Sequence, residues 1–123
     1  MEGMLGRMVL KSNLADDHER WSQASTMSWV NPDAPPFFAL HGTNDSLVPV
    51  EQARSFVEML RKESQQPVAY AELPYAQHAF EIFPSVRAAR VIEGVERFLT
   101  TLWERRQAPA RTQEAELAEA LTD

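Results

Sequence analysis

Two short apolar segments flank one amphipathic segment between residues 37 and 80, and this order leaves the chain few possible topologies. Residues 37–40 are continuously apolar, which is typical of a parallel strand covered on both faces. Residues 49–64 begin with a proline and repeat apolar side chains at helical spacing, and residues 68–74 form a second strand-like run. We therefore predict a strand–helix–strand unit of the α/β class, in which both strands are parallel and end at the same edge.

A residue suited to proton transfer follows each predicted strand. Asp45 lies just after the first strand and His78 just after the second. Because open α/β sheets place their chemistry at this edge, we expect the two side chains to be neighbours there. A carboxylate that orients an imidazole supplies two of the three groups of a hydrolytic triad, so Asp45 and His78 are the candidate catalytic residues. The structural alternative is an aspartate that closes a turn and a histidine on a surface loop.

Three other residues have side chains that could take part in catalysis or metal binding. We expect His41, beside Gly42, to make a structural hydrogen bond at the strand end, and His18 to be solvated in a polar segment. Ser46 directly follows Asp45, where it cannot face His78, so it is not the expected nucleophile. The spacing of the three histidines and the lack of cysteine predict no metal site.

Two convincing strands are too few for a stable sheet, so we predict a sheet that this chain leaves incomplete. The open edge of a buried-type strand needs a partner, which implies either a missing N-terminal half or self-association. The prolines at 32, 35 and 36 separate an irregular, partly helical lead-in, 1–34, from the α/β segment, 35–103. Residues 104–123 are polar, and we expect a tail that is disordered or a frayed helix.

Three motifs occur together in this part of the chain. They read Pro-Pro-Phe-Phe-Ala-Leu-His-Gly at 35–42, Asn-Asp-Ser-Leu-Val-Pro at 44–49 and Gln-His-Ala-Phe at 77–80. Together they resemble the C-terminal end of the α/β-hydrolase carboxylesterases and lipases, specifically the hormone-sensitive-lipase-like esterases, over residues 14–103. The resemblance implies the last two parallel strands, their crossover helix and a C-terminal helix. It also implies that Asp45 is the triad acid and His78 the base, in the chain order Ser, Asp, His.

The family's nucleophile is absent from these 123 residues. A nucleophile elbow reads Gly-x-Ser-x-Gly, but none of the four glycines stands two residues after a serine, and the His-Gly-Gly oxyanion loop is missing too. The resemblance therefore implies the acid- and base-bearing part of a serine ester hydrolase, inactive alone, with a small-molecule ester as substrate and no cofactor. Two alternatives stay open: a truncated, non-catalytic module that dimerises through its open sheet edge, or a segment of a prolyl-oligopeptidase-like or dienelactone-hydrolase-like enzyme.

The charge balance narrows the range of partners. The formal net charge is −6, which argues against nucleic acid or an anionic membrane surface as the main partner. Arg7 and Lys11 interrupt the short apolar patches near the N-terminus, so neither a signal peptide nor a membrane span is predicted there. Cytoplasmic residence is the default expectation.

Overall fold

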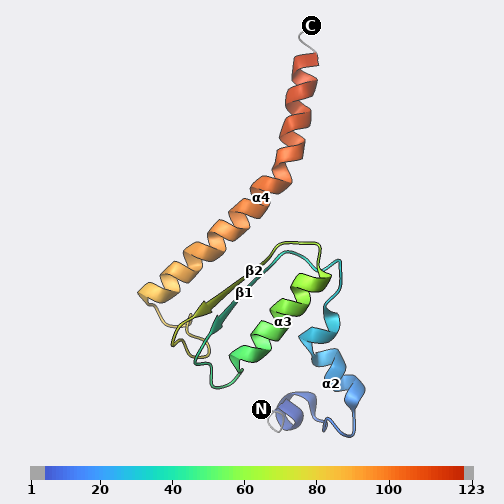
Figure 1. Ribbon diagram of the computed structural model, residues 1–123, viewed down its shortest axis with the longest axis vertical. Helices are drawn as coiled ribbons and strands as arrows, with labels where there is room; N and C mark the ends of the chain where they lie inside the picture. The colour runs from blue at the N-terminus through green and yellow to red at the C-terminus, as the bar shows by residue number, and fades with distance from the viewer. Residues whose placement is uncertain (1–4, 121–123) are drawn as a thin grey trace. The chain divides into compact units, whose positions relative to one another are not determined.

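The computed structural model describes residues 5–120. The chain divides into two units, Met1–Phe80 and Glu81–Asp123. The elements follow one another in the order η1 (Leu5–Leu10), α2 (His18–Ala24), η2 (Thr26–Trp29), β1 (Phe37–Gly42), α3 (Val50–Glu63), β2 (Val68–Leu73) and α4 (Val86–Ala120), where η1 is a π-helix and η2 a 3₁₀-helix (Figure 1).

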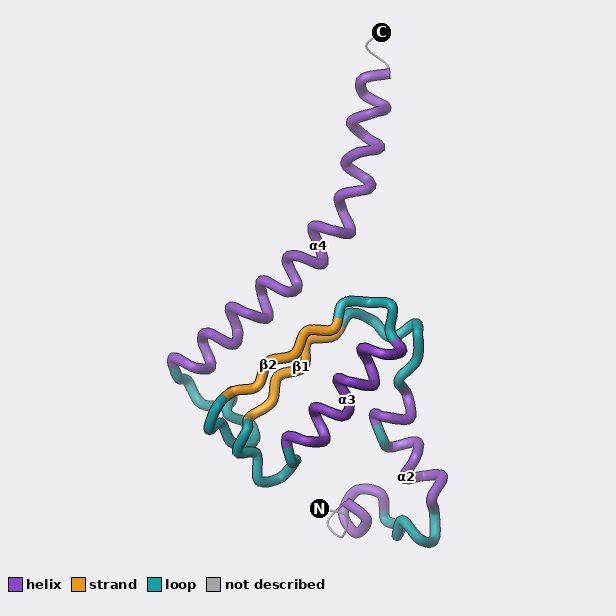
Figure 2. Tube along the Cα trace, in the orientation of Figure 1, coloured by secondary structure: helices purple, strands orange, loops and turns teal. Residues whose placement is uncertain are grey.

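The first unit contains the predicted strand–helix–strand arrangement. Strands β1 and β2 are parallel and pair in register from Phe37 with Val68 to Gly42 with Leu73, and α3 connects them (Figure 2). No third strand joins this sheet within the described residues. The α/β class and the incomplete sheet are thus confirmed. β1 runs two residues further than the apolar pattern alone indicates, because His41 and Gly42 continue the hydrogen-bonded ladder.

Helix α3 supplies the largest fully buried side chains of the small core. Pro49 is its N-cap residue, and the helix ends at Glu63, where the Ser64 N–H donates to the carbonyl of Leu60. Val57 and Leu60 are each only 2% exposed. Burying an aliphatic side chain of this size stabilises a fold by about 1.5–3 kcal/mol. The apolar face of the helix therefore fixes it to the sheet and sets the distance that the crossover spans.

The lead-in folds into short elements rather than one long helix. The carboxylate of Asp17 accepts a hydrogen bond of 3.1 Å from the Arg20 N–H and so caps α2. At the end of η2, the Trp29 indole donates to the Gln23 carbonyl of α2 at 2.8 Å and ties the two helices together. Residues 1–4 of the predicted lead-in lie outside the described residues.

The second unit consists largely of α4. The Ser85 hydroxyl accepts a hydrogen bond of 3.0 Å from the Ala88 N–H, so the helix begins just after the proline at position 84. It continues through the polar segment to Ala120, and residues 121–123 of the predicted tail lie outside the described residues. The proposed domain boundaries at 34 and 103 stay predictions. None of the described helices is both long and apolar enough to cross a bilayer.

Candidate active site

The parallel register brings the ends of β1 and β2 to one edge, and hydrogen bonds join the loops that follow. The Thr43 N–H donates to the Leu73 carbonyl at 3.0 Å, and the Asn44 N–H donates to the Ala76 carbonyl at 3.0 Å. In the opposite direction, the Tyr75 N–H donates to the Thr43 hydroxyl at 2.9 Å. These bonds extend the pairing of the strands into the loops that carry the two candidate residues.

The loop that carries His78 has little freedom. A Cβ atom on Gly42 would overlap the carbonyl oxygen of Ala76 and lie 2.7 Å from its carbonyl carbon, so the close approach of the two loops requires glycine. Tyr75 and Ala79 have φ angles of 60° and 55°, in the left-handed region that costs most L-residues about 1–2 kcal/mol. His78 therefore lies between two backbone positions whose conformations are held by the surrounding structure.

Asp45 is held by three hydrogen bonds. Its Oδ1 accepts from the N–H groups of Leu47 at 2.9 Å and Val48 at 2.8 Å, and its Oδ2 lies 2.9 Å from Nδ1 of His78. The side chain is only 5% exposed. Burial raises the pKa of this carboxyl, but the hydrogen bonds from Val48, His78 and Leu47 together outweigh burial, and its pKa lies below the ordinary value of 3.8. Asp45 is therefore a buried carboxylate that stays ionised at neutral pH.

His78 presents its other ring nitrogen away from the acid. The ionised carboxylate can only accept, so Nδ1 of His78 carries the hydrogen and Nε2 of the neutral ring is left as an acceptor. The His78 side chain is 47% exposed, in contrast to Asp45. The structure thus brings the two sequence-predicted residues together in the arrangement that a general base requires.

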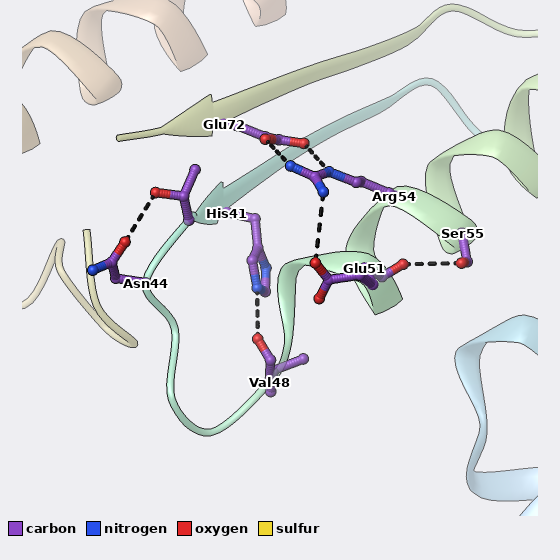
Figure 3. A network of polar contacts seen from close by, with 8 residues as sticks. His41, Asn44, Val48, Glu51, Arg54, Ser55 and Glu72 are labelled. Atoms are coloured by element: carbon purple, nitrogen blue, oxygen red, sulfur yellow. Dashed lines mark hydrogen bonds and ion pairs between the residues drawn. The ribbon is translucent and has the colours of Figure 1, made fainter. Parts of the chain in front are cut away.

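His41 lies nearer to the acid than its sequence position suggested. Its Nε2 is 2.9 Å from the Val48 carbonyl oxygen (Figure 3). The same nitrogen is 3.5 Å from Oδ2 of Asp45, and the His41 side chain is 15% exposed. The structural hydrogen bond expected for His41 at the strand end is present, but the sequence pattern does not predict that His41 lies beside Asp45. In the sequence, the signal that could have indicated this contact is the four-residue spacing of His41 and Asp45 across a turn.

A bidentate ion pair lies next to His41. Arg54 on α3 donates from Nε and Nη2 to the two carboxylate oxygens of Glu72 on β2, at 2.7 Å each (Figure 3). Glu72 is the register partner of His41, so the ion pair joins helix and sheet beside that ring. The Arg54 hydrogen bonds are the main cause that lowers the pKa of Glu72 to about 2, and those bonds also raise the pKa of Arg54. The fork geometry makes this a stronger contact than most surface ion pairs.

The lowered pKa of Glu72 predicts acid-sensitive stability. Above its ordinary value of 4.5 the ion pair contributes in full, and the contribution is lost as the pH falls toward about 2. We expect Glu72→Gln to lower the free energy of unfolding at pH 7 and to have a progressively smaller effect as the pH falls below 4. Urea denaturation across this pH range measures both. Glu63→Gln, at the end of α3, controls for the loss of one exposed carboxylate, and equal pH profiles for the two variants would contradict the prediction.

The remaining candidates do not join the site. His18 is the first residue of α2 and is exposed, and Ser46 is exposed in the turn after Asp45. Within the described part of the chain, no group of three or more histidine or acidic residues is arranged to hold a metal ion.

Known proteins are similar to this chain in sequence and in fold. The BD-FAE family model matches residues 3–60. The structure resembles the Est2 esterase of Thermogutta terrifontis with propionate bound, with a TM-score of 0.61 and 25% identity over 66% of this chain and 30% of that chain. Native Est2 shares the fold, with a TM-score of 0.64 at 23% identity over 78% of this chain and 38% of that one.

Curated relatives decide the family. The chain is 51% identical over 100 residues to the probable carboxylic ester hydrolase LipM of Mycobacterium tuberculosis, and 42% identical over 106 residues to the esterase LipQ of the same organism. The chain belongs to the esterases of the α/β-hydrolase fold. This chain is matched over 81% and 86% of its own length, but it spans only 23% of LipM and 25% of LipQ. The predicted resemblance and the partial α/β-hydrolase fold are confirmed.

Proposed function

We propose that this chain supplies the acid and the base of a serine ester hydrolase, with Asp45 as acid and His78 as base. The observation that carries the proposal is the 2.9 Å hydrogen bond between Asp45 Oδ2 and His78 Nδ1, made by an acid that is buried and a ring that is half exposed. Esterase names among the relatives favour ester substrates over the peptides or dienelactones that related folds cleave.

In the proposed reaction a serine from outside these 123 residues attacks the ester carbonyl. Nε2 of His78 takes the hydroxyl proton as the Ser O–C bond forms, and it returns that proton to the alcohol oxygen as the ester C–O bond breaks. Water then attacks the acyl-serine, giving a proton to Nε2, and the serine leaves with that proton as the carboxylic acid is released. Asp45 stays ionised and stabilises the His78 cation in both halves. No cofactor takes part in these steps.

A segment exchange tests the proposal. We expect the isolated chain to leave p-nitrophenyl butyrate intact and to resist a fluorophosphonate probe, because it has no nucleophile elbow. In a LipQ chimera, the quarter of LipQ that matches this chain is replaced by the matched residues of this chain. We expect this chimera to hydrolyse the ester and to label on a serine outside the exchanged segment. A folded but inactive chimera, or serine labelling of the isolated chain, would contradict the proposal.

One observation favours a different role. No strand pairs with the outer edges of β1 and β2 within the described residues, and an open edge can pair with a second copy of the chain. A non-catalytic dimer formed at this edge would elute as a stable, soluble species from a sizing column, and the LipQ chimera would then be inactive. Elution from the sizing column and the activity of the LipQ chimera together distinguish the hydrolase role from the non-catalytic dimer.

A further inference from the structure

The carboxylate of Asp45 lies close to two imidazoles, and the triad uses only one of them. Oδ2 is 2.9 Å from Nδ1 of His78 and 3.5 Å from Nε2 of His41. The two rings differ in their access to solvent, since the His78 side chain is 47% exposed and the His41 side chain 15% exposed. His41 therefore faces the acid from the protein side, where no substrate atom needs to pass.

The protonation of His41 follows from its partner. A backbone carbonyl only accepts, so the 2.9 Å contact between His41 Nε2 and the Val48 carbonyl places a hydrogen on Nε2. The same N–H lies 3.5 Å from Oδ2 of Asp45, close enough for electrostatic attraction although too long for a strong second hydrogen bond. This N–H therefore interacts with two groups of the loop from Asp45 to Val48, the Val48 carbonyl and the Asp45 carboxylate.

Val48 connects His41 to the acid a second time. Its N–H donates to Oδ1 of Asp45 at 2.8 Å, while its carbonyl accepts from His41. The bond between the Val48 N–H and the Asp45 carboxylate thus closes the loop from Asp45 to Val48. The bond between the Val48 carbonyl and His41 attaches this loop to the end of β1. If the His41 donor is removed, the Val48 carbonyl loses its partner and the carboxylate can rotate away from His78.

We propose that His41 is a positioning residue for the triad acid, which holds the loop from Asp45 to Val48 so that Oδ2 remains directed at Nδ1 of His78. The inference rests on the proposed function, because it assigns His41 a role toward that acid. His41 does not contact the reacting atoms. The titratable groups that face it are Asp45 on the loop that follows β1 and Glu72 on β2, and Glu72 is itself paired with Arg54 on α3.

The test compares three substitutions in the 123-residue chain labelled with ¹⁵N. His41→Gln retains an N–H donor at about the position of Nε2, whereas His41→Leu has none and His41→Asn is too short to reach the Val48 carbonyl. His18→Leu is the matched control on an exposed helix start. Circular dichroism establishes which variants fold, and the polar Asn variant provides the comparison if the Leu variant does not.

Two NMR readouts report on the acid and base without turnover. In the wild type and in His41→Gln, we expect the His78 ring to show hydrogen on Nδ1. In His41→Leu and His41→Asn, we expect that tautomer preference to weaken and the Val48 amide to exchange with solvent about 10-fold faster. His18→Leu should match the wild type. A purely structural role would leave the tautomer unchanged.

The outcome separates this inference from the hydrolase proposal. If His41→Asn retains the wild-type His78 tautomer and the wild-type rate of Val48 amide exchange, the positioning role is wrong, whatever the LipQ chimera does. If His41→Gln behaves like His41→Asn, the donor to Val48 is not the cause and the role is wrong as well. If the NMR changes occur but the chimera is inactive, His41 orders the Asp45–His78 pair and the hydrolase proposal fails on its own measurement.

Discussion

Asparagine at position 45 should lower ester hydrolysis by the LipQ chimera about 10⁴-fold, which is the usual cost of this exchange in a serine triad. An amide of the same shape fills the space of the carboxylate, but it cannot stabilise the cation that forms on His78. Its NH₂ group can also face Nδ1, which would place the ring hydrogen on Nε2, where the nucleophile needs an acceptor. The loss should appear in kcat, because the exchanged atoms do not bind substrate.

Two further variants make this result specific. His78→Gln removes the base itself and should cost at least as much as Asp45→Asn, and the double variant should be little worse than His78→Gln, because the two residues act as one unit. Asp33→Asn, an exposed aspartate before β1, should leave kcat unchanged. If Asp45→Asn retains more than a tenth of the activity, the acid of the triad is a different residue.

Alanine at position 42 should be the most damaging small change to the fold near the site. The added methyl group would overlap the carbonyl group of Ala76, so the loop that carries His78 must move away from the loop that carries Asp45. Overpacking of this kind costs about 1–3 kcal/mol of unfolding free energy. A displacement of about 1 Å at a catalytic group can cost about 100-fold in rate. Urea denaturation of the chain and kinetics of the LipQ chimera measure the two effects.

In Gly42→Ala the added methyl group would clash with backbone atoms of Ala76, and this determines which control variants are informative. Ala76→Gly removes only the 3.1 Å contact with the Ala76 methyl group, so it should not rescue Gly42→Ala. Gly94→Ala, within α4, should stabilise by about 0.5–1 kcal/mol, because alanine favours a helix interior. Unchanged stability and kinetics in Gly42→Ala would show that the loops approach less closely than the structure indicates.

The parts of the fold that sequence predicted are those where periodicity and chain direction determine the structure. The apolar spacing after Pro49 indicates a helix, and a helix between two strands makes them parallel, so Asp45 and His78 had to emerge at one edge. The predicted juxtaposition follows from topology and does not depend on the details of the loops. The role of the pair in catalysis stays a prediction.

The features that sequence did not predict depend on contacts without a period. His41 reaches Asp45 only because the residues between them form a turn, and a spacing of four residues is not by itself enough to specify that contact. The need for glycine at 42 arises from Ala76, which is distant in sequence. The polar segment after Trp103 lacks an apolar stripe, but its Glu, Arg and Ala residues have high helix propensity, and α4 continues through it.

The crossover between β1 and β2 also determines when the site can form during folding. Asp45 and His78 are 33 residues apart, and local structure alone cannot bring them together. Closing that loop costs conformational entropy before the strand pairing can stabilise the fold. Non-local pairing of this kind is the slow step in small α/β proteins. Helix α3 can gain structure early from contacts between near neighbours. The carboxylate and the imidazole, however, should meet only in the last cooperative step, when β2 docks on β1, so an intermediate with α3 formed would still lack the acid–base pair.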